Sequence, residues 1–397
     1  MIKATQTKTK QPTNNLCIIQ VHFKRVSTMS TESTQLEYPY DSPPPFGTTQ
    51  EVAPGVRWLQ MPLPMSLKYI NLYLIEDEDG WTIVDTGIRG DETRDLWLKV
   101  IENELKGKPV TRIVCTHMHP DHTGQAGFLT QHCRVSLSMS FQEYLMAKTM
   151  GPMTRDGNHW QTEAYFERAG IEKSFLEELH NTPSSFAPTA NDHPFPISFT
   201  RLVEGQILTI GGVEWEIICG MGHSPEHVCL YSKQHRILIS GDQILPIVTS
   251  NVSVHPTEPE ANPLLGWMES HVKFKALIPN ETLVLPAHNL PFYNVQARLD
   301  ELIEHHEDRM LQLEESCVTP RVAVDLLPVL FARKLEGYTK IMALGECVAH
   351  LHCLMSRNRI ERTLEGNRYL YRSIAPDLST RAHPDSHEPP DDLPRMV

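Results

Sequence analysis

The sequence predicts an α/β protein built as a four-layer αββα sandwich, in which two mixed β-sheets pack face to face between outer helices. Apolar runs of strand length alternate with helical segments over about residues 49–294. Segments rich in Asp or His stand directly after several of these strands, at 83–87, 116–124 and 237–242. Because loops held by rigid strands are the usual place for functional side chains, one end of the sandwich is expected to carry a site.

The individual elements follow from the spacing of apolar residues. A helix is expected at 91–105, where Asp91 or Thr93 stands near the start and apolar residues such as Ile101 and Leu105 recur at helical spacing. A second helix is expected at 125–131, directly after the His-rich segment. Strands are expected at 55–61, 70–76, 81–85, 112–116, 135–138, 206–210, 213–219, 228–232 and 236–240.

An insertion at about 140–200 separates the two halves of the sandwich. Helices are expected there at 141–150, 159–169 and 173–179. Their large apolar side chains allow two interpretations, a lid that forms an apolar pocket or core contacts that hold the insertion down. The residues concerned are Tyr144, Met146, Met150, Trp160, Tyr165 and Phe166.

The segment Thr116-His-Met-His-Pro-Asp-His-Thr-Gly124 carries the densest set of metal-ligand side chains in the chain. Neutral imidazole is the commonest metal ligand, and carboxylate complements it. His117 and His119 can bind one ion together, since side chains at i and i+2 of an extended segment point the same way. The turn at Pro120 can aim Asp121 and His122 towards a second ion. A solvated loop is the alternative, which the HxHxDH spacing disfavours.

Further candidate ligands follow along the chain. Asp85 ends the strand-like run 81–85, and Asp242 follows the run 236–240. His223 lies in a Gly-rich segment, and His288 follows the apolar run 284–287. In order and type these motifs resemble the metallo-β-lactamase superfamily over about residues 52–291, and they are most similar to its glyoxalase II-like hydrolases.

This resemblance implies a role for each motif residue. Asp85 corresponds to a buried aspartate that supports the metal site and is not itself a ligand, and Asn289 stands where the family often has Gly. Left-handed backbone angles are better tolerated by Asn than by most residues. The implied ligands are His117, His119 and His223 for a first ion, Asp121, His122 and His288 for a second, and Asp242 as the bridging carboxylate.

The expected cofactors are two divalent ions, with zinc as the default and iron or manganese as alternatives. Such ions lower the pKa of a bridging water enough to supply hydroxide, which attacks a carbonyl. Asp121 is expected to orient this nucleophile and to carry its proton. His255 is either a further acid or base or a rim residue, whereas His227 and His271 are expected to be structural.

A small acyl thioester of glutathione or coenzyme A is the expected substrate, because a thiolate leaving group needs little protonation. Lactones or other esters are the nearest alternative, followed by RNA cleavage and by a ligand-sensing regulator that binds DNA. The net charge of −13 disfavours nucleic acid as a partner. Electron transfer is disfavoured as well, since relatives that perform it usually have Glu in place of His119.

Composition favours a cytoplasmic enzyme. The eight cysteines show no CxxC pair and indicate reduced, mostly buried thiols. No apolar stretch approaches the length of a membrane span. Residues 1–48 are expected to be a disordered or extended leader, with a transit peptide as the alternative.

Past the sandwich, residues 295–375 predict a small, mostly helical domain that resembles the winged-helix cap of some superfamily members. Helices are expected at 295–313, 321–335 and 341–355, followed by a hairpin at 359–372 that turns at Glu365-Gly366-Asn367. The helix at 341–355 carries no Lys or Arg, which disfavours DNA reading. A structural role or a homodimer contact is expected instead, and residues 376–397 predict a disordered tail.

Overall fold

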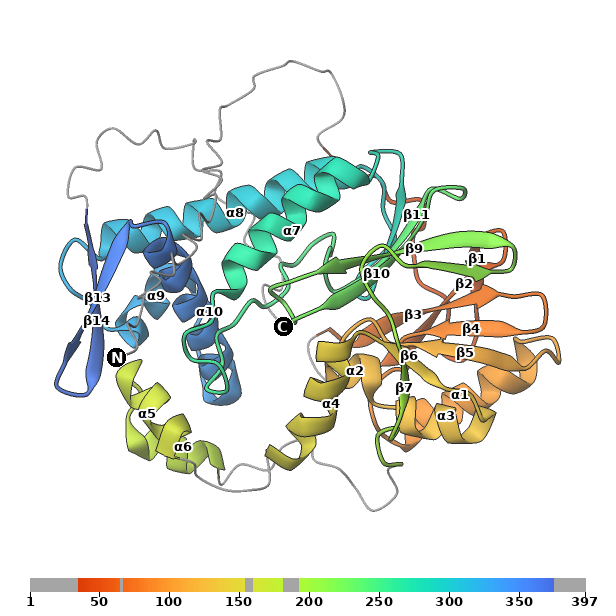
Figure 1. Ribbon diagram of the computed structural model, residues 1–397, viewed down its shortest axis with the longest axis horizontal. Helices are drawn as coiled ribbons and strands as arrows, with labels where there is room; N and C mark the ends of the chain where they lie inside the picture. Colours follow the sequence, from red (N-terminus) through yellow and green to blue (C-terminus); the bar gives the residue numbers. More distant parts are fainter. Residues whose placement is uncertain (1–34, 65–66, 154–159, 181–192, 375–397) are drawn as a thin grey trace, which may run out of the picture. The chain divides into compact units, whose positions relative to one another are not determined.

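A computed structural model describes residues 35–64, 67–153, 160–180 and 193–374 (Figure 1). All of these residues belong to one compact unit, Thr34–Val397. Residues 1–34 and 375–397 lie outside the described residues, so the predicted leader and tail stay predictions.

The first sheet has seven strands that follow one another in chain order. Strands β1 to β4 pair antiparallel, and β4 to β7 pair parallel. The strands are β1 Gln50–Ala53, β2 Val56–Pro62, β3 Tyr69–Glu76, β4 Trp81–Val84, β5 Val110–Val114, β6 Leu137–Met139 and β7 Phe199–Arg201.

The second sheet has five strands in the order β12-β11-β10-β9-β8. Its pairs are antiparallel except for β11 and β12, which run parallel. The strands are β8 Ile207–Ile210, β9 Val213–Gly220, β10 His227–Ser232, β11 Ile237–Gly241 and β12 Leu283–Pro286.

Apolar side chains from both sheets form the central core, where Trp58 and Tyr73 of the first sheet belong to the same buried cluster as Trp215 of the second. Helices α1 (Asp91–Asn103) and α3 (Ala126–Cys133) cover the outer face of the first sheet. Helices α7 (Pro263–Leu277) and α8 (Val295–Ser316) cover the second sheet (Figure 1). The predicted four-layer αββα sandwich is therefore confirmed.

The alternation of side chains in β3 explains why one strand can serve two layers. Leu72 and Leu74 pack with the outer helices, whereas Tyr73 and Ile75 point into the core between the sheets. Successive side chains of a strand point to opposite faces, and both faces are buried here. This produces the nearly continuous apolar sequence of the strand.

The C-terminal region has its own core of helices and a two-stranded sheet, in agreement with the predicted small, mostly helical domain. Helix α8 belongs to both cores, since Leu299 packs with the second sheet and Met310 with the C-terminal cluster. The further elements are η1 Ala323–Leu326, α9 Leu327–Leu330, α10 Gly337–Ser356, β13 Ile360–Glu365 and β14 Arg368–Ser373. The hairpin turns where the sequence places it, whereas its winged-helix character stays a prediction.

The helix expected at 321–335 is wrong as a single element. Arg321 pairs with Tyr371 through two backbone hydrogen bonds and so extends the edge of the hairpin. Pro328 is accommodated only in the first turn of the short α9, because a proline inside a helix removes a hydrogen bond and clashes with the preceding turn. Phe331 is extended, with φ −132° and ψ 110°, and ends the helix.

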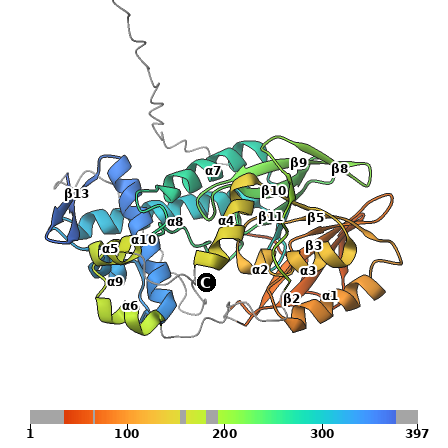
Figure 2. The same ribbon diagram turned by 60° about the horizontal axis from the view of Figure 1, so that its bottom comes forward.

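The insertion forms α4 (Phe141–Met153), α5 (Trp160–Arg168) and α6 (Lys173–His180). Tyr144 stacks on Phe199 at 3.9 Å between ring centroids, and Tyr165 and Phe166 are buried in the C-terminal core. Accordingly, α5 lies beside the C-terminal helices in both views (Figure 1, Figure 2). Trp160 is 70% exposed. These contacts favour the core interpretation for the three buried aromatics, while the side chain of Met150 lies outside the described residues.

Two compositional expectations can be compared with the described part of the chain. Its cysteines are free, and all of them except Cys133 are buried. Within the same residues, there is no helix that combines the length and the apolar character needed to cross a membrane.

Candidate metal centre

The predicted ligands gather at the ends of neighbouring strands. The His-rich segment follows β5, Asp242 follows β11 and His288 follows β12, while His223 lies in the loop between β9 and β10. Helix α2 (Pro120–Thr123) is a single turn that carries Asp121 and His122. The structure brings all seven predicted ligands together, in two groups of side chains that could each hold one ion.

The first group consists of His117, His119, His223 and Asp242. The Nε2 atom of His117 lies 2.9 Å from Nδ1 of His119 and 3.2 Å from Nε2 of His223. Oδ2 of Asp242 lies 3.4 Å from His223 Nε2. Three imidazole nitrogens and one carboxylate oxygen therefore point at the same small volume.

The second group consists of Asp121, His122 and His288. Oδ2 of Asp121 lies 3.4 Å from Nε2 of His288 and 3.7 Å from Nε2 of His122. Oδ1 of Asp242 lies 3.4 Å and 3.5 Å from the same two nitrogens. Asp242 therefore presents one carboxylate oxygen to each group, which is the arrangement of a bridging ligand.

In three of these histidines, a hydrogen-bond acceptor holds the ring nitrogen Nδ1, and Nε2 is the nitrogen that faces the centre. His223 Nδ1 lies 2.8 Å from the Asn251 carbonyl oxygen, and His288 Nδ1 lies 3.2 Å from the Tyr69 carbonyl oxygen. Oδ2 of Asp85 takes the same position for His122 Nδ1, at 2.8 Å. A carbonyl or carboxylate can only accept, so each Nδ1 donates to its partner, and each Nε2 is the atom that would bind a cation in place of a proton.

Two buried atoms test whether a cation fits. Nε2 of His122 and Oδ1 of Asp242 have no hydrogen-bond partner among the described residues. Buried polar atoms without partners are costly and call for an explanation. A divalent ion held by the second group would satisfy both atoms, since both face that group, and imidazole with carboxylate is a ligand set that suits zinc.

Charge in the centre is balanced among its own residues. Burial opposes ionisation of Asp242, yet the imidazoles of His288 and His122 outweigh it and hold the pKa of Asp242 well below its usual range. Burial likewise works against protonation of His288, but the carboxylates of Asp242 and Asp121 raise the pKa of His288 to about 10. In the first group, burial lowers the pKa of His119 to about 3. The carboxylates of Asp121 and Asp242 therefore favour a positive charge at the second group.

Asp85 lies behind the ligands, in the supporting position that the resemblance implies. Its carboxylate accepts from the Thr116 backbone N–H at 2.7 Å and from the Thr116 hydroxyl, besides holding His122. The backbone of Asp85 is left-handed, with φ 64°. Such strain persists only where the surroundings fix it, and it concentrates at functional sites.

Asn71 holds the turn that carries His288, a role that the sequence does not indicate. Its Nδ2 donates to the carbonyl oxygens of Pro286 at 2.9 Å and Asn289 at 2.6 Å. Its Oδ1 accepts from Trp58 and Gln60. Asn289 itself has φ 67°, so the departure from Gly keeps the left-handed turn.

Glu143 at the start of α4 is a second supporting residue that sequence reasoning missed. The side chain is buried, and its two oxygens accept from the backbone N–H groups of Met118 at 2.9 Å and Glu226 at 2.7 Å. Glu143 therefore ties the His-rich segment to the loop that carries His223. Burial raises the pKa of Glu143 despite these bonds.

The remaining histidines near the centre differ in position. His227 accepts from the Asp242 backbone N–H at 3.1 Å and stacks on His117, which agrees with a structural role. His271 is buried and bonded to the Trp267 carbonyl oxygen. His255 is exposed, and whether it acts as an acid or base or is a rim residue stays a prediction.

Two family models match this sequence. The one described as "Metallo-beta-lactamase superfamily" matches residues 66–288, a span that includes every predicted ligand. The one described as "Metallo-beta-lactamase-like, C-terminal domain" matches residues 310–373.

Similar proteins cover both parts of the chain. The crystal structure of a beta-lactamase domain protein from Burkholderia ambifaria is 38% identical, with a TM-score of 0.78, and the match covers 85% of this chain and 98% of that one. A probable metallo-hydrolase of Bacillus subtilis, YqjP, is 24% identical over 333 residues, which are 80% of this chain and 97% of that protein.

Two other relatives have names that state a substrate. The linear primary-alkylsulfatase of a Pseudomonas species is 25% identical over 67% of this chain and 51% of that protein. The human acyl-coenzyme A thioesterase MBLAC2 is 24% identical over 48% of this chain and 63% of that protein.

Proposed function

The chain belongs to the metallo-beta-lactamase superfamily, and from this premise we propose that it is a dinuclear metal-dependent hydrolase of a small acyl thioester. The observation that carries the proposal is the position of Asp242. Each of its oxygens lies within 3.5 Å of a ligand nitrogen of a different group. A carboxylate shared in this way supports two ions held side by side rather than one structural ion.

The residues of the site divide the work between binding and proton transfer. Two divalent ions would supply Lewis acidity that lowers the pKa of water and polarises a carbonyl group. Asp242 stays anionic between the two groups, because His288 and His122 hold its pKa down. Asp121 is the more exposed site carboxylate, at 16% against 10% for Asp242. It is therefore the group that we assign to accept the proton of the attacking water and pass it towards the leaving group.

A thioester fits a site with this set of groups. Thiolates are good leaving groups, so their departure does not depend on a cationic acid beside the ions. The thioesterase name of a relative supports the same class. The proposed carrier is glutathione or coenzyme A, and zinc is the first choice of metal for a His-rich site.

Other substrates receive less support. A lactone or simple ester needs only the same groups, and an alkyl sulfate is suggested by another relative. For nucleic acid, the C-terminal helix α10 is unsuitable, because residues 343–354 of this helix are all buried. A recognition helix must expose a face to the groove of DNA.

The decisive measurement is thiol release from a panel of acyl-glutathione and acyl-coenzyme A thioesters by the zinc-loaded enzyme. The comparison is with Asp121→Ala at equal metal content. Asp95→Ala is the matched control, since Asp95 lies on α1 with a side chain that is 72% exposed. We expect thioester turnover in the wild type and in the control, and its collapse in Asp121→Ala.

A different result would redirect the proposal. Metal-loaded enzyme that releases thiol from no member of the panel refutes the thioester assignment, and lactones and alkyl sulfates are then the next substrates to measure. Full turnover by Asp121→Ala would refute the role of that carboxylate.

A further inference from the structure

His223 differs from the other ligands in what supports it. The carbonyl oxygen that fixes its ring belongs to Asn251, which lies between β11 and α7 in a segment without helix or strand. By contrast, the support for His288 comes from Tyr69, the first residue of β3. Irregular backbone has no ladder of hydrogen bonds to hold it, so other contacts must set the position of Asn251.

Those contacts lead to α10 in the C-terminal region. The Asn251 side-chain amide donates to Oε2 of Glu346 at 2.9 Å. Three residues further along, the backbone N–H of Val254 donates to the Gly345 carbonyl oxygen at 3.1 Å. The Ser253 hydroxyl lies 2.6 Å from Oδ1 of Asn251 and 3.2 Å from the Met342 carbonyl oxygen.

Helix and segment approach so closely that only glycine fits between them. A Cβ atom on Gly345 would lie 2.9 Å from both the Ser253 Cβ and the Val254 carbonyl oxygen. Glycine inside a helix is destabilising relative to alanine, because it loses more backbone freedom on folding. Its presence in the middle of α10 is therefore explained by this contact.

Glu346 is an acid in an apolar core. Its side chain is buried, and burial raises the pKa of Glu346 to about 7. Burying a polar group is costly unless it is hydrogen-bonded, and its bond to Asn251 meets that need. The same bond leaves the amide of Asn251 little freedom, which in turn limits the carbonyl oxygen that faces His223.

We propose that α10 is part of the metal centre, with Glu346 as a positioning residue that acts through Asn251 on the ring of His223. The inference rests on the proposed function only in so far as the two groups bind metal. The C-terminal region would then have a structural role at the metal centre, and this role does not depend on the identity of the substrate.

The test compares metal binding by full-length variants. Glu346→Ala removes the acceptor for Asn251, whereas Glu346→Gln keeps an oxygen that can accept. Glu314→Ala is the control, because Glu314 is buried in the same region and bonded to Arg359 at 2.7 Å, an ion pair that shares no residue with the bonds of Asn251. The readouts are the affinity of each ion in chelator competition and the visible spectrum of the cobalt-substituted protein, with thermal unfolding of the apoprotein measured in parallel.

Loss of a supporting partner typically weakens metal binding by about 10–100-fold. We expect Glu346→Ala to weaken one ion by about 10-fold and to change the cobalt spectrum, and Glu346→Gln to restore both. Glu314→Ala should lower the unfolding temperature and keep both affinities. If Glu346→Ala does not fold, Asn251→Ala replaces it, since this change keeps the backbone carbonyl and removes the amide.

Unchanged affinities and spectrum in Glu346→Ala would overturn the inference. So would an equal loss of affinity in Glu314→Ala, because the effect would then be one of general stability. Wild-type protein that binds two ions but releases no thiol refutes only the proposed substrate. Wild-type protein that binds no ion refutes both proposals.

Discussion

The two ends of the sandwich are built from the same strands but carry different chemistry. At the ends where β4, β5, β11 and β12 finish, imidazoles and carboxylates converge with their lone pairs directed at common points. At the opposite end, the turns between strands surround a pocket of about 290 Å³. This second pocket is lined by Glu76, Asp77, Lys108, Trp215 and His235, among other residues.

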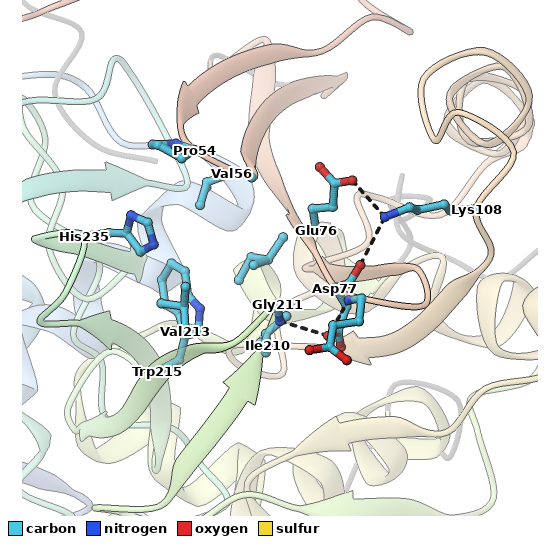
Figure 3. Close-up of a pocket in the computed structure, with 13 residues that line it drawn as sticks. Pro54, Val56, Glu76, Asp77, Lys108, Ile210, Gly211, Val213, Trp215 and His235 are labelled. Carbon is cyan, nitrogen blue, oxygen red and sulfur yellow. Dashed lines mark hydrogen bonds and ion pairs between the residues drawn. The ribbon is translucent and has the colours of Figure 1, made fainter.

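The pocket at the opposite end has polar groups that are mostly satisfied by one another. Figure 3 shows Lys108 bonded to Glu76 and to Asp77, and Asp77 bonded to Gly211. Among the described residues that line it, the Trp215 indole nitrogen is a buried atom without a partner. At the metal end, by contrast, the unpartnered atoms include Nε2 of His122 and Oδ1 of Asp242, two candidate ligand atoms that lie 3.5 Å apart. What distinguishes the metal end from the pocket end is the convergence of buried ligand atoms that lack partners, and not the size of a cavity.

The largest expected effect comes from removing the shared carboxylate. Asp242→Asn should lose metal and activity together, and the loss should exceed the roughly 10–100-fold that supporting residues cost. Asp77→Asn is the matched change at the other end, where the oxygen accepts only from backbone N–H groups. Metal content by elemental analysis and thioester turnover check both variants. If Asp242→Asn retained two ions, the Asp242 carboxylate would be no more important for metal binding than Asp77 at the other end.

Asp85→Ala should have the next largest effect. The change removes the acceptor for His122 Nδ1 and for Thr116, and so should weaken metal binding by about 10–100-fold while the protein stays folded. Chelator competition and circular dichroism measure the two outcomes. Asp85→Asn serves as the control for backbone strain, since Asn tolerates the left-handed angles of this position. If the Asp85→Ala apoprotein were unfolded and the Asp85→Asn apoprotein folded, the role of Asp85 would be to stabilise the fold and not to support the metal site.

A smaller effect is expected from pH, through Glu346 behind the metal end. Burial raises its pKa from the usual 4.5 to about 7, so the folded state binds this proton more tightly than the unfolded state. The resulting stabilisation is complete below pH 4.5 and is lost as the pH rises towards 7. Urea unfolding of the apoprotein at several pH values should therefore show wild type losing stability relative to Glu346→Gln across this interval. If the free energies of unfolding of the two proteins changed in parallel with pH, this prediction would be refuted.

The gathering of the candidate ligands was predictable because each one stands in a short motif at or just after the end of a strand. His117 to His122 lie within six positions, and Asp242 directly follows β11. The spacing of apolar residues was likewise enough to predict the strands. The C-terminal hairpin was predictable because its turn at Gly366 connects strands that are adjacent in sequence.

The supporting residues could not be predicted from sequence, since their partners are distant along the chain. Asn71 contacts Asn289 across 218 positions, and Asn251 contacts Glu346 across 95. A single Asn in a strand and a single Glu in an apolar helix carry no local signal for such roles. The prediction of one helix at 321–335 was wrong for a local reason. It relied on the many apolar residues there and did not take into account that Pro328 is tolerated only in the first turn of a helix.

The smallest effect is expected at the pocket end, from Lys108→Ala. The Lys108 ammonium lies 3.0 Å from Glu76, with side chains that are 39% and 33% exposed. Exposed ion pairs of this kind contribute roughly 0.2–1 kcal/mol, because solvent and salt screen them. Urea unfolding should show a loss of this size, with metal content and turnover unchanged. Lys108→Ala that impaired turnover without loss of stability would mean that the two ends are coupled, and the pocket would then have to be treated as part of the functional site.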